Sequence, residues 1–497
     1  MSFNLDVTRR SFLSSGAAGI GLALRSSRVS PSTSYEPLPS ERQVRWSEME
    51  YYNFLHFTVN TFTDKEWGYG SEDPAIFNPT QFDADAIVEA LKASGSKGVI
   101  LTCKHHDGFC LWPTSTTSHS IRNSPYKAGK GDIVKEISRA AGRHGLKFGV
   151  YVSPWDRSQA SYGTPQYLQI YRKQVEELLT GYGPVFEIWH DGANGGTGYY
   201  GGANEKRIID KRHYYDWPAT WALERKLQPD AVIFSDVGPD VRWVGNEKGI
   251  AGETCWATYT PLSPDGGPGS PGDVQEKQSI VGTRNGEYWM PAECDVSIRP
   301  GWFWHERENN QVKSPRDLLD LYYDSVGRGA SFLLNVPPDR RGLISDNDRA
   351  ALRGFRALID QIFSHDLAID ATVNATNVRG RSPEFSPKTL LDGDRYSYWS
   401  TDDPITQADV TFDLPRPTQF DIVRIRENIR LGQRVDSFMV EVWTEGNWSR
   451  FGEGTSIGSC RIVGAQAPVT TTRVRLRITK AAVCPALSEF GLFSERV

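Results

Sequence analysis

Between about residue 46 and residue 363 the sequence alternates between short apolar runs, typical of strands, and longer segments with helical periodicity. Eight strand candidates with crossover helices predict a (β/α)8-like TIM barrel, which we place at residues 42–363. The fifth to seventh strand candidates are poorly separated by helices, so the pattern does not by itself require a complete eightfold barrel. The strand candidates are 53–59, 98–104, 146–152, 185–189, 231–235, 241–244, 294–298 and 331–336, and the helix candidates include 84–93, 133–144, 167–179, 217–227, 315–326 and 346–362.

After residue 364 the pattern changes to short β-rich runs that alternate between apolar and polar residues, with turns between them. This pattern predicts a β-sandwich over residues 364–497. The fold class is therefore α/β plus all-β, a barrel followed by a sandwich. The runs are 410–412, 422–425, 438–443 and 472–478.

The first 30 residues carry an Arg9-Arg10 pair ahead of a short, weakly apolar run at 14–24. This order is typical of a twin-arginine export signal, so we expect a periplasmic or secreted bacterial protein. The run is too short to span a bilayer as a stable anchor. An incidental arginine pair is the alternative, and the Ser/Pro-rich residues 31–41 are expected to form a linker.

The formal net charge is -5, and no long run of a single sign occurs. This composition argues against a nucleic-acid partner and against membrane insertion, and it favours a neutral ligand. Fifteen Trp and twenty Tyr residues suit sugar binding, although most such rings simply pack in cores. The six cysteines lack Cys-x-x-Cys spacing, which argues against a zinc ribbon, and Cys460 could pair with Cys484 in an oxidising compartment.

The strand predicted at 185–189 runs into Asp191, and the Asp-Gly step that follows indicates that the strand ends there. Because the loops after parallel barrel strands open on one side, Asp191 is a candidate for chemistry. The alternative is an aspartate that only stabilises a turn. Other predicted strand ends also carry polar or aromatic groups, at His56, 104–109, 151–156 and 240–247.

His105 and His106 are a possible metal-binding pair. Adjacent residues on an extended segment point to opposite faces, so we expect that the two do not bind one ion and that no metal site is present. Hydrogen bonding to a hydroxylated ligand, or orientation of a neighbouring group, is the better interpretation. A structural histidine with satisfied hydrogen bonds is the alternative for either residue.

Two carboxylates that act on one bond, with aromatic rings that hold the ligand, are typical of a glycosidase active site. Five spaced motifs resemble, in order, those of glycoside hydrolase family 29, the retaining α-L-fucosidases. The resemblance covers about residues 42–363 and implies a barrel enzyme without a cofactor. The motifs are His56, Glu66-Trp67, 104–109, 189–192 and 240–247.

The resemblance implies a role for each matched residue. Asp191 corresponds to the nucleophile, and Arg242 is expected to lie near it and to favour its ionised form. Glu247 lies in a Gly-Asn-Glu segment similar to the subgroup specific for α-1,3/1,4-linked fucose, and it is the implied acid/base, with Glu253 and Glu293 as competitors. The expected sugar-binding residues are His56, Glu66, Trp67, His105, His106, Tyr151, Trp155, Trp189 and Arg242.

The expected substrate is a fucosylated oligosaccharide or glycoconjugate. The C-terminal segment resembles galactose-binding-like, discoidin-type domains at 391–394 and 398–399, and it either binds carbohydrate or packs against the barrel. Two other functions stay open, a non-catalytic carbohydrate-binding protein on the same barrel and a barrel glycosidase for a related sugar. The sequence does not decide the oligomeric state.

Overall fold

The computed structural model describes residues 29–495, and the Arg9-Arg10 pair of the expected export signal lies outside them. Eight parallel strands close into a barrel in the order β1-β12-β11-β8-β7-β4-β3-β2. Because β1 pairs with both β2 and β12, each barrel strand has a neighbour on both sides. The TIM-barrel prediction is confirmed. The strands are Tyr51–Leu55 (β1), Gly98–Lys104 (β2), Lys147–Val152 (β3), Glu187–Trp189 (β4), Val232–Ser235 (β7), Val241–Trp243 (β8), Ala292–Ser297 (β11) and Ser331–Asn335 (β12).

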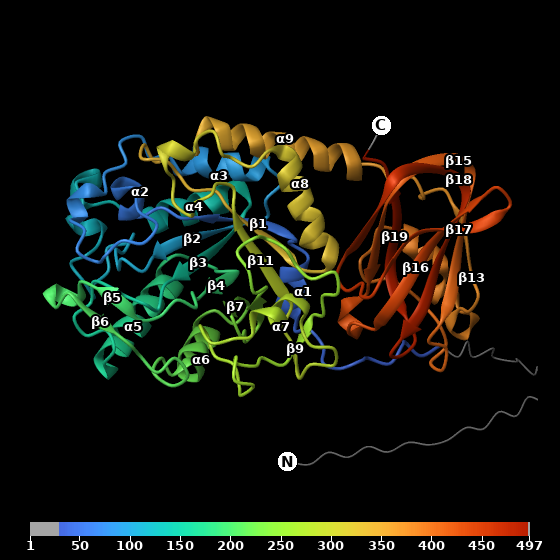
Figure 1. Cartoon of the computed structure of the whole chain (residues 1–497), viewed down its shortest axis with the longest axis horizontal. Helices are drawn as coiled ribbons and strands as arrows, with labels where there is room; N and C mark the ends of the chain where they lie inside the picture. Colours follow the sequence, from blue (N-terminus) through green and yellow to red (C-terminus); the bar gives the residue numbers. More distant parts are fainter. Residues whose placement is uncertain (1–28, 496–497) are drawn as a thin grey trace, which may run out of the picture. The chain divides into compact units, whose positions relative to one another are not determined.

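Helices cover the outside of this barrel (Figure 1). In α4 (Ile133–His144), for example, the Asp132 side chain accepts a hydrogen bond from the Lys135 amide at the start, and Gly145 ends the helix in the left-handed conformation, with φ of 72°. Among the described residues, no helix is both long and apolar enough to cross a lipid bilayer. The other principal helices are Glu41–Ser47 (α1), Val59–Thr63 (α2), Ala84–Ala93 (α3), Pro165–Gly181 (α5), Trp217–Leu227 (α6), Pro315–Asp324 (α8) and Asp346–Phe363 (α9).

The connections around β8 explain why the sequence shows a weak helical signal there. Residues 236–240 alone join β7 to β8, and Ser235 then pairs with Arg242 in parallel. The longer connection from β8 to β11 contains the short strands β9 (Thr258–Tyr259) and β10 (Tyr288–Trp289) and the helix α7 (Glu276–Val281). The barrel therefore closes even though this part lacks regular strand-helix alternation.

The C-terminal strands form the predicted β-sandwich. Its long strands β15 (Ala408–Glu427) and β18 (Arg461–Ala481) pair antiparallel along most of their length, with register shifts after Asp413 and after Phe420. The first part of β15 also pairs with β13 (Thr372–Ala375), and its second part pairs with β19 (Ala486–Phe493), so the strand contributes to two layers. The runs 410–412 and 422–425 are thus parts of one strand. The remaining strands are Trp399–Ser400 (β14), Val435–Thr444 (β16) and Asn447–Gly454 (β17).

All six cysteines lie in the described part of the chain, and each is buried and unpaired. A disulfide between Cys460 and Cys484 is therefore wrong for this structure. The Cys484 sulfur instead accepts a hydrogen bond from Arg434 Nη1 at 3.4 Å, which gives the thiol a polar partner without a covalent bond.

Glu50, between α1 and β1, joins the barrel to the sandwich. Its carboxylate contacts Arg395 and lies 2.7 Å from Nη1 of Arg426, a buried residue that also pairs with Glu489 at 2.7 Å. Burial alone would raise the pKa of Glu50, but the charges of Arg426 and Arg395 outweigh it and lower the pKa to about 2. This carboxylate is therefore ionised in the folded protein at neutral pH.

We expect Glu50→Ala to lower the free energy of unfolding by about 1–3 kcal/mol, because a buried arginine loses one of its acceptors. The folded pKa of about 2 lies below the ordinary 4.5. The stabilisation is therefore complete above pH 4.5 and is lost as the pH falls toward 2. Denaturant unfolding at pH 7 and pH 3 should show a smaller difference from wild type at pH 3. Glu48→Gln, at an exposed position nearby, is the control, and equal differences at both pH values would contradict the prediction.

Candidate active site

A cavity of about 330 Å³ opens at the C-terminal ends of the barrel strands. This is the face of a TIM barrel where the loops after the strands can combine into one site. The cavity brings together groups from the ends of β1, β2, β3, β4, β7, β8 and β11. Of the predicted residues, it is lined by His56, Trp67, His105, His106, Tyr151, Trp189, Asp191 and Glu247.

Asp191 lies just beyond the end of β4 with its side chain 23% exposed. Its Oδ1 accepts a hydrogen bond from the Ala193 amide at 2.6 Å, which is the turn contact that the sequence suggested as an alternative. Its Oδ2 accepts from the Tyr151 hydroxyl at 2.7 Å and lies 3.8 Å from His106 Nε2. One oxygen therefore fixes the loop while the other is held in the cavity, so the turn and the chemical interpretations are compatible.

The hydrogen bonds of His56 define its tautomer. The Asn335 amide donates to Ser297 Oγ at 2.9 Å and to the Trp302 carbonyl at 2.7 Å, so its oxygen is the acceptor that faces His56 Nδ1 at 3.0 Å. His56 therefore carries its proton on Nδ1. Burial lowers the pKa of His56 to about 4, which keeps the ring neutral and leaves Nε2 as an acceptor.

The hydrogen bonds of His106 also define its tautomer. Ser153 donates its hydroxyl proton to the Trp155 carbonyl at 2.8 Å, so its oxygen must accept from His106 Nδ1 at 2.7 Å. Burial lowers the pKa of His106, and the neutral ring again leaves Nε2 as an acceptor in the cavity. Burial and the neighbouring histidines lower the pKa of His105 well below its ordinary value, and its Nδ1 has no hydrogen-bond partner among the described residues. The cavity thus contains neutral imidazoles.

The expectation that His105 and His106 face opposite sides is wrong. Both line the cavity, and their ring centroids are 4.0 Å apart. The chain turns directly after Lys104, the last residue of β2, so strand alternation no longer applies. Lys104 itself points away from the cavity and donates to Gln174 Oε1 at 2.8 Å. Among the described residues, no group of three or more His, Cys, Asp or Glu side chains is placed to hold a metal ion.

Of the three candidate acid/base residues, Glu247 is the one at the cavity. It is exposed at the mouth, where the Trp302 indole donates to Oε2 at 3.3 Å. Partial burial of the carboxyl group, followed by the charges of Asp191 and Glu66, raises the pKa of Glu247. A raised pKa favours the protonated form that an acid requires.

The other two candidates lie elsewhere. The Glu253 side chain is 74% exposed and pairs with Arg328 at 2.8 Å and Arg461 at 3.2 Å, away from the cavity. Glu293 is fully buried in β11, beneath the cavity floor, where it accepts from the Trp189 indole at 2.7 Å and from the Tyr52 hydroxyl. Neither carboxyl group lines the cavity.

The predicted position of Arg242 beside Asp191 is wrong. Its buried guanidinium donates to the Ser279 carbonyl at 3.1 Å and to the Met290 carbonyl, and it does not line the cavity. Side chains alternate along β8, so the neighbouring Trp243 faces the cavity while Arg242 faces the opposite side.

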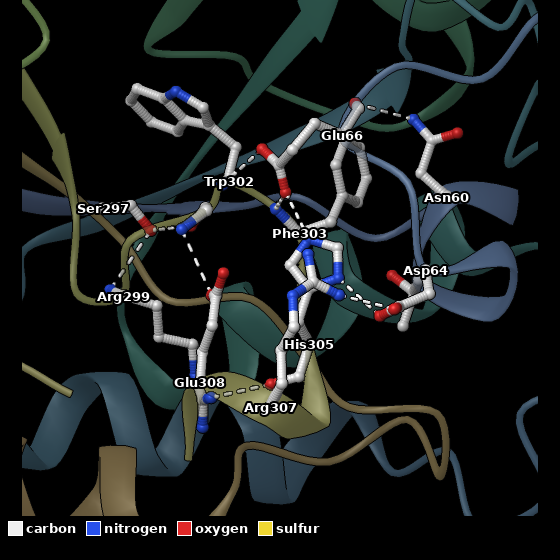
Figure 2. Close-up of polar contacts among 12 residues, drawn as sticks. Asn60, Asp64, Glu66, Ser297, Arg299, Trp302, Phe303, His305, Arg307 and Glu308 are labelled. Atoms are coloured by element: carbon white, nitrogen blue, oxygen red, sulfur yellow. Dashed lines mark hydrogen bonds and ion pairs between the residues drawn. The ribbon is translucent and has the colours of Figure 1, made fainter. Parts of the chain in front are cut away.

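Glu66 and Trp155 pack against the residues that line the cavity. The Glu66 carboxylate accepts from the Trp302 amide at 2.8 Å and contacts His305 at 2.6 Å, as Figure 2 shows. The Trp155 ring packs 5.3 Å from His106 and 5.6 Å from Trp67, between ring centroids. Glu66 and Trp155 therefore do not line the cavity themselves, but each contacts residues that do.

The cavity also has lining residues that the sequence pattern did not predict. Asp236 directly follows β7, a strand-end signal of the kind that identified Asp191, and burial raises its pKa to about 7. Asp295 accepts from the Trp243 indole at 2.8 Å, and burial raises its pKa well above the ordinary value. Trp302 comes from the loop after β11, where no pattern in the sequence indicated a site.

A closed barrel whose rim holds paired carboxyl groups, neutral histidines and aromatic rings has the features of a barrel glycosidase. Comparisons with known proteins agree. A family model for alpha-L-fucosidase matches residues 31–360, and one for the F5/8 type C domain matches residues 371–490. The chain belongs to the alpha-L-fucosidase family, and it is a glycoside hydrolase that carries a C-terminal discoidin-like domain.

Individual relatives match over nearly the whole chain. Alpha-L-fucosidase 1 of Arabidopsis thaliana is 43% identical over 93% of this chain and 88% of its own length. A glycoside hydrolase family 29 member from an unknown rumen bacterium is 39% identical with a TM-score of 0.82, over 94% of this chain and 78% of that one. A family 29 fucosidase of Ruminococcus gnavus, solved in complex with fucose, is 31% identical with a TM-score of 0.82, over 94% and 97% of the two chains.

We expect His56 to remain neutral through pH 5–8, because its folded pKa of about 4 lies below the ordinary 6.5. Between these values the unfolded chain binds a proton that the folded protein does not, so this residue lowers stability as the pH falls below 6.5. Nuclear magnetic resonance of histidine-labelled protein measures the titration, and His56→Asn assigns the signal. A His56 titration midpoint near 6.5 would contradict the burial argument.

Proposed function

We propose that the chain is a retaining exo-α-L-fucosidase that releases terminal α-1,3/1,4-linked fucose from branched oligosaccharides or glycoconjugates. The observation that carries this proposal is the placement of Asp191 and Glu247 on one cavity in different environments. Asp191 accepts two hydrogen bonds, whereas the pKa of Glu247 is raised. Such a difference suits a nucleophile and an acid, respectively.

In the proposed mechanism, an Asp191 oxygen attacks the anomeric carbon of the fucosyl unit. The glycosidic C–O bond breaks as Glu247 gives its proton to the departing oxygen, and a covalent fucosyl-enzyme forms. Glu247, now ionised, takes a proton from water, whose oxygen attacks the same carbon and displaces Asp191. Two inversions retain the configuration, and Glu247 regains its proton.

The neutral histidines fit the recognition of a polyhydroxylated sugar. His56 and His106 each present an acceptor Nε2, so each can receive a hydrogen bond from a sugar hydroxyl. Trp67 is 53% exposed at the cavity, and its ring offers an apolar surface to the sugar. The fucose held by the related Ruminococcus gnavus structure supports this choice of ligand.

The linkage preference rests on the Gly245-Asn246-Glu247 segment and on the aromatic mouth of the cavity. Trp243 and Trp302 line that mouth beside Glu247, where a second sugar ring would bind. A branched substrate presents such a ring next to the fucose, and the flat indole faces suit it.

Asp191→Ala should lower kcat for fucose release by at least about 10³-fold, because it removes the nucleophile. We would measure free fucose from a Lewis-type α-1,3/1,4-fucosylated trisaccharide and from 2′-fucosyllactose. Release from the trisaccharide alone by wild type supports the linkage proposal. Tyr199→Phe, outside the cavity lining, is the control. Absence of release from both sugars by folded wild type would favour the carbohydrate-binding alternative.

We also propose that the protein is exported by the twin-arginine route. The Arg9-Arg10 pair ahead of the apolar run supports this. Replacing both arginines by lysine should retain the protein in the cytoplasm of a bacterial host, as measured by fucosidase activity in the cell fractions. Arg25→Lys, after the run, is the matched control, and unchanged export of the double variant would contradict the proposal.

A further inference from the structure

The loop after β11, residues 298–313, is fastened to the loop after β1 by a buried histidine. His305 lies with Nδ1 2.6 Å from Asp64 Oδ1 and Nε2 2.6 Å from Glu66 Oε1, as Figure 2 shows. The His305 side chain is fully buried, whereas the two carboxylates are partly exposed. We refer to Asp64, Glu66 and His305 as the clamp. It joins two loops that are more than 200 residues apart in sequence.

The clamp acts on the backbone of Trp302. Glu66 Oε2 accepts from the Trp302 amide at 2.8 Å, and the Asn335 side chain donates to the Trp302 carbonyl at 2.7 Å. The preceding Gly301 permits this approach, because a β-carbon there would lie 2.5 Å from Glu66 Oε1. The peptide groups on both sides of the Trp302 side chain are therefore fixed.

The Trp302 side chain connects this backbone to the cavity. Its ring lies beside His56, with centroids 5.2 Å apart, and its indole N–H donates to Glu247 Oε2 at 3.3 Å. Glu247 itself is exposed at the mouth of the cavity, and among the described residues its carboxylate accepts one hydrogen bond, that from Trp302. We infer that the clamp is a positioning unit that holds Trp302 so that its indole orients Glu247 toward the glycosidic oxygen. This inference rests on the proposed role of Glu247 as acid/base.

The arrangement also affects the protonation of Glu247. Burial and the negative charges of Asp191 and Glu66 raise the pKa of Glu247, whereas the hydrogen bond from Trp302 lowers it. The buried Asp295, on β11, is electrostatically coupled to the same carboxyl group. Removal of the indole N–H therefore takes away a contact that favours the ionised form. The pKa of Glu247 should rise as a result.

The test compares two substrates that differ in their need for an acid. An aryl fucoside with a good leaving group, such as 2-chloro-4-nitrophenyl α-L-fucoside, needs little protonation, whereas an α-1,3-fucosylated trisaccharide needs it fully. Trp302→Phe keeps a ring beside His56 but removes the donor. We expect it to lower kcat on the trisaccharide at least about ten-fold and on the aryl fucoside less than about three-fold. The basic limb of its kcat/KM profile should move to higher pH.

His305→Gln, which weakens the clamp, should show the same substrate dependence. Lys65→Gln is the control, because Lys65 lies between two clamp residues in sequence but pairs with Glu72 at 3.2 Å. Equal losses on both substrates in Trp302→Phe, or an unchanged pH profile, would overturn the inference. Glu247→Gln separates the two ideas. If Glu247→Gln slows both substrates equally, the proposed acid/base role fails as well. If Glu247→Gln slows the trisaccharide more than the aryl fucoside but Trp302→Phe does not, only the positioning role is refuted.

Discussion

Closure of eight parallel strands is the constraint on which the cavity depends. Because the last barrel strand pairs with the first, Asn335 at the end of β12 meets His56 beyond β1 and fixes its tautomer. The same closure gives the loops after β1 and β11 adjacent positions on one rim, so that Glu66 reaches the Trp302 amide. The order of the strands in the closed barrel thus brings together residues that are far apart in sequence.

Burial then determines which groups on this rim carry charge. It lowers the pKa values of the three cavity histidines and raises those of Asp236 and Asp295, so most groups around the cavity favour their neutral forms. Asp191 lies among these groups and accepts hydrogen bonds from the Tyr151 hydroxyl and from a backbone amide. A carboxyl group that two donors hold among neutral imidazoles suits the nucleophile of the proposed mechanism.

The regular parts of the molecule could be predicted from sequence because their signals are local. The helices 84–93, 133–144 and 217–227 and the strand 98–104 match the structure at both ends. The failed predictions have two different causes. His105 and His106 follow the end of β2, where the chain turns, whereas Arg242 lies in the middle of a three-residue strand and faces away from the cavity. Trp302 lay beyond prediction because its place depends on a contact with Glu66, which is 236 residues away in the sequence.

The positions of the three candidate carboxylates show that proximity to a motif in the sequence does not identify a catalytic residue. Glu293 has a neighbour, Glu187, and burial together with the adjacent carboxyl group raises the pKa of Glu187 well above its ordinary value, so the pair retains a proton. Both oxygens of Glu293 already accept hydrogen bonds, from Tyr52 and Trp189, beneath the indole that floors the cavity. Such a carboxyl group can hold Trp189 in place but cannot reach a sugar. Glu247, in contrast, lines the mouth of the cavity, where a glycosidic oxygen can approach it, and the Trp302 indole donates to it there.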